Sequence, residues 1–203
     1  MGWQYIIGVQ EYFPHLGEAQ KNNAILFYDY FSALGATLEA VCGMLGNITR
    51  ESSLNPGMMQ TVSPTSGWGL IQWTPSTVLT RWCNQRLYNW YDGAAQCYRI
   101  QCEGLGTEDA GGTWLPTSDY PYSWSEFLAL TDVEEAVKAY LFERERAGVS
   151  ALAERIQYAN EWYEYLSGQP TPPTPPTPVP PTPYQGVKKM PVYMMLRNRH
   201  NRL

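Results

Sequence analysis

A run of fourteen residues near the C-terminus limits what this chain can fold into. Residues 170–183 read PTPPTPPTPVPPTP, and prolines at this density remove backbone donors and favour an extended polyproline II rod. Such a rod does not join a packed core. We therefore predict one globular domain over residues 1–168, a Pro/Thr-rich linker over 169–183, and a basic tail over 184–203 that is disordered or anchoring.

Charge is distributed unevenly between these parts. Residues 1–169 hold 9 lysines and arginines and all 19 acidic residues, a net charge of 9 − 19 = −10, whereas residues 170–203 hold 5 basic side chains and no acidic ones. Binding to phosphate backbones depends on clustered Lys and Arg. The acidic body therefore argues against nucleic acid as the main ligand.

The sequence also bears on membranes, metals and disulfides. No run approaches the roughly 20 apolar residues of a membrane-spanning helix, and Met1–Tyr5 lacks the basic start of a secretory signal. With two histidines and no C-x-x-C pair, we expect no metal site and no cofactor. Cys42 is interpreted as a core residue. One disulfide can form among Cys83, Cys97 and Cys102, and its pairing stays open.

Apolar spacing over the first 168 residues predicts a mainly helical domain. Helices are expected over residues 24–34, 38–51, 77–90, 94–103, 132–146 and 150–166. Glycine and proline are frequent over 56–77, which favours a loop or a short β-hairpin there. Residues 104–122 are expected to form a surface loop.

The second of these helices ends in a candidate acid. Val41, Met44, Ile48 and Glu51 follow one another at spacings of three, four and three, so they share one helical stripe that faces the core. Partial desolvation and the negative end of the helix dipole are expected to raise the pKa of Glu51. A glutamic acid that keeps its proton near neutral pH can protonate a departing glycosidic oxygen. The alternative is an ordinary surface glutamate in a last helical turn.

A short segment after this helix is suited to binding sugars. Gly67 and Gly69 allow close approach of the backbone to a ligand and positive φ. Gln72 can offer a donor and an acceptor to an N-acetyl group. Trp68 and Trp73 are either stacking faces for sugar rings or packing residues under the loop.

Together these motifs resemble the signature of phage tail lysozymes and, more distantly, those of goose-type lysozymes and soluble lytic transglycosylases. The first motif is Gly43-x-x-Gly46-Asn47-Ile48-x-x-Glu51-Ser52-x-Leu54-Asn55-Pro56, and the second is Gly67-x-Gly69-Leu70-Ile71-Gln72-Trp73. The likeness covers residues 22–166. It implies that Glu51 is the catalytic acid and that the second motif lines the sugar cleft.

Three further segments extend the resemblance. They are Gln96-x-x-x-Ile100-x-x-Glu103, Ala139-x-x-Phe142-x-x-Glu145-x-x-Gly148 and Arg155-x-x-x-Ala159. Residues 144–148 read RERAG and lack the tyrosine and proline that the family usually has there. Glu145 is therefore either a substrate-binding residue or the partner of an arginine in a buried ion pair.

The resemblance implies a lysozyme-like helical domain, with a loop or β-hairpin lobe after the catalytic helix, that cleaves peptidoglycan glycan strands as a muramidase. It also implies a place in the phage virion tail, with tail proteins as partners of the basic tail, or in the host cytoplasm before lysis. The rivals are a lytic transglycosylase and an inactive glycan-binding tail protein. A peptidase or amidase is disfavoured, because the chain has only two histidines: His15 precedes the helical body, and His200 lies beyond the proline-rich run.

A second carboxylate is the open question of mechanism. A retaining glycosidase needs one about 5 Å from the acid, and an inverting one needs it about 6.5 to 9.5 Å away. The candidates are Asp92, Glu103, Asp119 and Glu145, since no acidic residue lies between Glu51 and Asp92. Single-glutamate relatives act as transglycosylases, so that reaction stays open beside hydrolysis, which we favour.

Overall fold

The computed structural model describes residues 2–110, 114–145, 151–169 and 180–181. Its helices are α1 (Glu18–Ser32), α2 (Leu38–Ser52), α3 (Thr77–Gln85), α4 (Gly93–Leu105), α5 (Trp124–Leu128), α6 (Val133–Tyr140), the π-helical turn η1 (Leu141–Glu145) and α7 (Leu152–Ser167). Two short strands, β1 (Gly8–Val9) and β2 (Met58–Met59), complete the elements. The expected mainly helical class is confirmed. Most of the expected linker and all of the basic tail lie outside the described residues.

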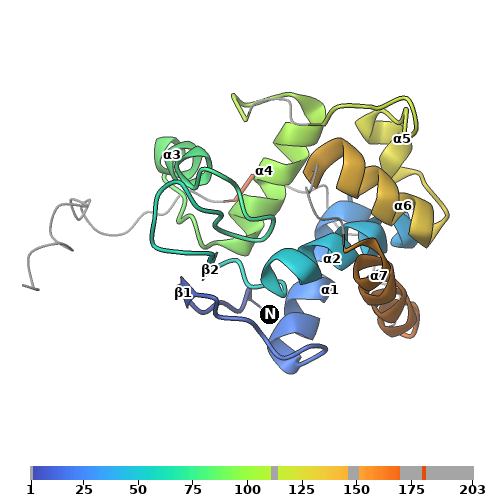
Figure 1. Cartoon of the computed structure of the whole chain (residues 1–203), viewed down its shortest axis with the longest axis horizontal. Helices are drawn as coiled ribbons and strands as arrows, with labels where there is room; N and C mark the ends of the chain where they lie inside the picture. The colour runs from blue at the N-terminus through green and yellow to red at the C-terminus, as the bar shows by residue number, and fades with distance from the viewer. Residues whose placement is uncertain (1, 111–113, 146–150, 170–179, 182–203) are drawn as a thin grey trace, which may run out of the picture.

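The helices surround α2 in two groups (Figure 1). The two strands and α3 lie on one side of the molecule, α5, α6 and α7 lie on the other, and α4 passes between the groups. Helix α2 packs against α1, α5, α6 and α7, and eleven of its fifteen residues are buried. The helix that ends in the candidate acid is therefore the central helix of the fold.

Local signals define both ends of α2. The Thr37 hydroxyl accepts a hydrogen bond from the Ala40 backbone N–H (3.0 Å), as an N-cap should. At the other end Ser53 and Leu54 both adopt left-handed φ (51° and 60°), which stops the helix directly after Ser52. The sequence predicted this helix and its cap correctly.

Two glycines let neighbouring helices approach α2 closely. A Cβ added at Gly46 would lie 2.4 Å from the carbonyl oxygen of Arg155 and 2.8 Å from the Cβ of Ala159, both on or next to α7. A Cβ at Gly43 would lie 2.6 Å from the Cβ of Ala136 on α6. Glycine in a helix interior costs about 1 kcal/mol relative to alanine. At Gly43 and Gly46 the absence of a side chain lets α6 and α7 pack directly against the backbone of α2.

The structure differs from the expected elements at three places. Helix α3 stops at Gln85 rather than near residue 90, because Leu87 adopts a left-handed φ of 59° and Asp92 caps a new helix. The short helix α5 was not expected, although Ser123 and Glu126 form a capping box at its start. The helix expected over 132–146 widens into the π-helical turn η1 after Tyr140.

The expected loop or hairpin lobe is an irregular segment with little regular sheet. Strand β2 pairs in parallel with β1, Gly8 opposite Met58 and Val9 opposite Met59. Single antiparallel bridges then join Met59 to Trp68 and Trp68 to Trp73. The lobe thus recruits a strand from the first ten residues of the chain.

All four cysteines are free and buried, so the disulfide that the sequence allowed is absent from the structure. Burial raises the pKa of every thiol, that of Cys83 to about 12. A thiol is unreactive when it stays protonated, so these cysteines act as small core residues. Within the described part of the chain, no helix has the length and apolar character that crossing a membrane requires.

Glu143, in η1, is a fully buried carboxyl group that the sequence did not single out. Its Oε1 accepts a hydrogen bond from the Tyr122 backbone N–H (3.2 Å), whereas Oε2 has no hydrogen-bond partner among the described residues. Burial raises the pKa of Glu143 to about 7, although the hydrogen bond from Tyr122 opposes the shift. The folded protein therefore holds a proton on Glu143 that the unfolded chain releases at lower pH.

The close approach at Gly46 generates the first prediction. Gly46→Ala should lower the free energy of unfolding by about 2 kcal/mol, because overpacking against the α7 backbone outweighs the gain in helix propensity. Urea denaturation followed by circular dichroism measures the change. Glu164→Ala, on the exposed face of α7, should change stability by less than about 0.5 kcal/mol. A more stable Gly46→Ala variant would contradict the close helix packing.

Glu143 generates a prediction about pH. Since its folded pKa of about 7 exceeds the usual 4.5, its contribution to stability is present below pH 4.5 and is lost as the pH rises through 7. Glu143→Gln should remove this loss, so that the variant gains roughly 1 to 3 kcal/mol on the wild type between about pH 5 and pH 8. Melting curves across this range test it. The exposed Glu134→Gln should follow the wild type, and an unchanged slope in Glu143→Gln would refute the buried proton.

Candidate active site

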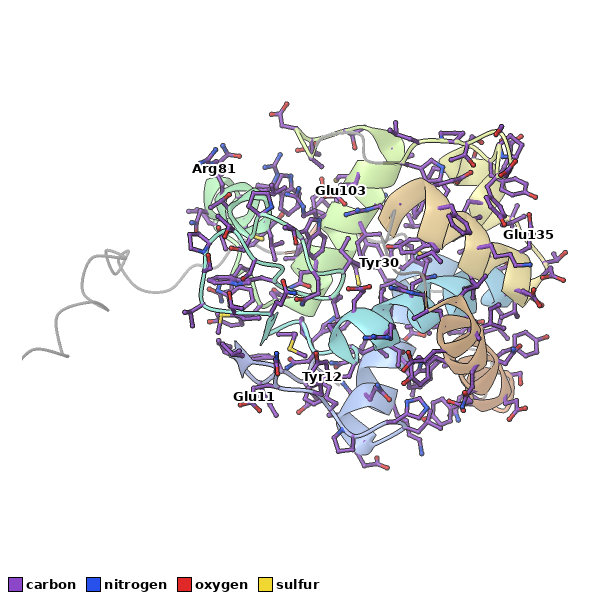
Figure 2. The ribbon with its side chains drawn as sticks, in the orientation of Figure 1. Glu11, Tyr12, Tyr30, Arg81, Glu103 and Glu135 are labelled. Atoms are coloured by element: carbon purple, nitrogen blue, oxygen red, sulfur yellow. The ribbon has the colours of Figure 1, made fainter. Side chains whose placement is uncertain are left out.

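A groove of about 570 Å³ runs past the C-terminal end of α2. Its described lining residues are Tyr12, Arg50, Glu51, Met58, Gln60, Ile71, Gln72, Trp73, Thr74, Val78, Glu103 and Arg144. In Figure 2 Glu103, on α4, and Tyr12, after β1, are labelled on either side of the end of α2. The groove thus collects residues from both groups of helices and from the N-terminal segment.

Glu51 reaches this groove from the last turn of α2. Its side chain is 24% exposed, so it is partly desolvated and still open to a ligand. On its protein side, Nη2 of Arg155 lies 2.5 Å from Oε1 of Glu51. Nη1 of the same arginine donates to the carbonyl and side-chain oxygens of Asn47 (3.2 and 3.1 Å). The stripe expected on α2 therefore ends in an acid that faces both the groove and a buried cation.

The glycine-containing loop lies beside this acid. The hydroxyl of Ser52 donates to the carbonyl of Leu70 (2.7 Å), which ties residues 67–73 to the end of α2. Gln72 lines the groove with a left-handed φ of 51°, and its Nε2 donates to the carbonyl of Gly69 (2.7 Å). Its Oε1 can accept from a ligand while that donor is in use.

Gly67 and Gly69 let the loop pack closely against other residues of the protein, and neither is among the described lining residues of the groove. Gly69 has a φ of +82°, and a Cβ there would lie 2.8 Å from Oε1 of Gln96. A Cβ at Gly67 would lie 2.9 Å from the Cβ of Gln72. The expected positive φ is present at Gly69, but the close approach is to Gln96 and Gln72. These glycines position Gln72 and are not themselves among the groove-lining residues described.

The two tryptophans of the motif differ in position. Trp73 lines the groove, but it is only 4% exposed, and its indole N–H donates to Oε1 of Glu103 (2.7 Å). Trp68 packs against Trp90, with ring centroids 4.8 Å apart, and its N–H donates to the carbonyl of Thr61. Trp68 thus packs on Trp90 outside the described groove lining, whereas Trp73 is part of that lining. Their contacts with sugar rings stay predictions.

Glu103 is the candidate second carboxylate that the structure brings to the groove. It is buried, and three donors hold it: Trp73, Nε of Arg99 (2.9 Å) and Nη2 of Arg144 (2.6 Å). Desolvation lowers the pKa of Arg99, and Glu103 opposes that shift. Both oxygens of this carboxylate are committed to donors, so it is poorly placed to act as a nucleophile or base. Its contacts instead join α4 to η1.

Asp92 and Asp119, two of the other acidic candidates, are not among the described lining residues of the groove. Asp92 caps α4, where its Oδ1 accepts from the Ala94 N–H (2.9 Å). Asp119 is exposed in the loop before α5. Glu145 ends η1, and its side chain lies outside the described structure, so neither role expected for it is tested.

Several groove residues escaped the sequence reasoning. Tyr12 and Gln60 belong to irregular segments without a helical or strand pattern. Arg50 is the exposed residue that precedes Glu51. Arg155 appeared only as part of a resembling segment, and its ion pair joins residues 104 positions apart. Spacing arguments reach a few residues along a helix and give no signal for such contacts.

The chain is similar to known bacteriophage proteins. The sequence model of the phage tail lysozyme family matches residues 22–166 of the chain. Over 151 residues the chain is 30% identical to Morphogenesis protein 1 of Bacillus phage B103. That alignment covers 72% of this chain and 40% of the phage protein. The chain thus matches less than half of the length of this relative.

Proposed function

Because the chain belongs to the phage tail lysozyme family, we propose that it is a muramidase that cleaves the β-1,4 bond between N-acetylmuramic acid and N-acetylglucosamine. Family membership supports a peptidoglycan-lytic activity in general, and the residues of the groove support this specific reaction. The observation that carries the proposal is the partly exposed Glu51, in a groove of about 570 Å³ that also holds Gln72. This volume lies within the range of about 300 to 1,000 Å³ that is usual for ligand-binding clefts.

In the proposed reaction Glu51 is the general acid. Its proton passes to the glycosidic oxygen as the bond from that oxygen to C1 of the muramic ring breaks, which leaves a carboxylate on Glu51 and positive charge on the sugar. Nη2 of Arg155, 2.5 Å from Oε1 of Glu51, faces the negative charge that develops on Glu51 as the proton leaves. Asn47 holds the guanidinium in place during the transfer. Water then attacks C1 and releases a proton, which restores the acid form of Glu51, and the product has a reducing muramic end.

The second candidate reaction is lytic transglycosylation, and one observation favours it. Among the described groove residues only Glu51 and Glu103 have carboxylates, and Glu103 is committed to two arginines. With no available second carboxylate, the N-acetyl group of the substrate can assist at C1, and a hydroxyl of the muramic residue can attack in place of water. The product is then an anhydro end.

We further propose that the protein acts from the phage virion, where it opens the cell wall during DNA entry. The family and the phage morphogenesis relative support this place of action. The basic tail is proposed to bind other tail proteins. Mass spectrometry of purified particles tests the location, since a protein found only in lysates would have to act as an endolysin from the host cytoplasm.

Glu51→Gln generates the central prediction. The glutamine retains the size of the side chain but has no acidic proton to give, so the rate of peptidoglycan cleavage should fall about 10³-fold while the melting temperature stays near that of the wild type. The matched control is Glu39→Gln, in the first turn of the same helix, which should retain activity. A folded Glu51→Gln variant with full activity would overturn the assignment. An inactive wild type would instead favour a glycan-binding structural protein.

The ends of the released fragments distinguish the two reactions. Hydrolysis by a muramidase is expected to give reducing muramic acid ends, which borohydride converts to muramitol and mass spectrometry detects. Anhydro-muramic ends, 18 Da lighter than the reducing ends by the loss of one water, would replace the muramidase proposal by the transglycosylase. Reducing glucosamine ends would contradict both reactions.

A further inference from the structure

We propose that a side pocket beside Glu51 binds the peptide that branches from the muramic acid residue next to the cleaved bond. This inference rests on the proposed function, because it concerns how the same groove reads its substrate. The side pocket, of about 210 Å³, is lined by Tyr12, Phe13, His15, Gln20, Thr49, Arg50, Ser53, Glu154 and Tyr158. It shares Tyr12 and Arg50 with the groove, so the two cavities meet at these two residues.

The chemistry of the substrate requires an exit for this branch. A muramidase breaks the bond at C1 of muramic acid, so that ring must lie against the acid, and its lactyl group carries the peptide away from the glycan. The branch therefore starts within about one sugar ring of Glu51. Arg50, the residue before Glu51, marks the point where the side pocket opens.

Charged groups in the side pocket suit a short peptide with free carboxylates. Nε of Arg50 lies 2.8 Å from Oε2 of Glu154, and these two side chains are 46% and 44% exposed. An ion pair this exposed contributes at most about 1 kcal/mol, so Arg50 can exchange Glu154 for a ligand carboxylate at little cost. The ring of His15 contacts the carboxylate of Glu161 through Nε2, and both side chains are partly exposed. The side pocket thus has one exchangeable cation, Arg50, and one imidazole.

The wall at Tyr12 is preformed. Its ring is 56% exposed, while the backbone around it is fixed: the Phe13 N–H donates to Oγ of Ser53 (2.6 Å) and Nδ2 of Asn55 donates to the carbonyl of Glu11 (2.7 Å). Exposed aromatic rings on a rigid backbone bind ligands with little loss of entropy. Tyr12, Phe13 and His15 all precede residue 22, where the family match begins. The aromatic wall of the side pocket therefore comes from the segment before the family match, whereas Arg50 and Glu154 lie within the match.

The test compares two substrates: glycan strands with their peptides, and the same strands after an amidase has removed the peptides. Wild type should have a higher kcat/KM for the peptide-bearing strands. Arg50→Gln should lower the ratio of the two kcat/KM values about tenfold, the loss expected for a hydrogen bond to a charged group. Glu154→Gln frees Arg50 from its competing partner and should raise the ratio. The control is Glu134→Gln, which breaks an exposed ion pair with Lys138 on α6 and should leave the ratio unchanged.

The ratio of the two kcat/KM values should change in opposite directions in Arg50→Gln and Glu154→Gln. This distinguishes a role in peptide binding from a purely structural role. If the Arg50–Glu154 pair only stabilised the fold, both substitutions would shift the ratio and the melting temperature in the same direction. Equal kcat/KM on both substrates in wild type, or a ratio unmoved by Arg50→Gln, would overturn the inference and leave the muramidase intact. Failure of wild type to cleave either substrate would instead overturn the proposed function.

Discussion

The rest of the structure depends on the contact of Arg155 with the end of α2. This buried guanidinium donates to Asn47 and to Glu51, and it comes from α7, which can approach only because Gly46 has no side chain. Because the Glu51 side chain is 24% exposed, this ion pair is only partly desolvated, and its loss costs less than that of a fully buried pair. The groove acid and the packing of the last helix thus share one arginine.

A second group of ion pairs, centred on Glu103, also joins separate elements beside the groove. Glu103 accepts from Trp73 in the lobe, from Arg99 in its own helix and from Arg144 in η1. Together with Arg155 these groups join the two groups of helices across the groove. The carboxylates of this site thus differ in role because their neighbours differ: Glu51 keeps an open side, whereas Glu103 has three donors and almost no exposure.

The sequence predicted the parts of this site that depend on short-range patterns. The buried stripe on α2 and the cap at Thr37 follow from periodicity and capping preferences, and the structure has both. Gln72 lines the groove, and its contact with a sugar stays a prediction. Periodicity does not reveal that α3 stops early at Leu87 or that Trp68 packs on Trp90. Those outcomes depend on contacts between distant segments. The ion pair of Arg155 with Glu51 and that of Glu103 with Arg144 depend on such contacts too. A one-dimensional pattern holds no information about which arginine faces which acid.

Strand β1 precedes the residues that the family model matches, 22–166, and pairs in parallel with β2 inside that match. The folding unit is therefore larger than the matched segment. The side chain of Asn55 exchanges hydrogen bonds with the backbone of Ile6, and Gln10 donates to the carbonyl of Met59. Trimming the protein to residues 22–166 would leave the amide of Asn55 without these partners and remove one wall of the groove. The boundary of the family match at residue 22 therefore cuts through a physically continuous domain. A transfer of this domain into another protein has to include the residues that precede the match.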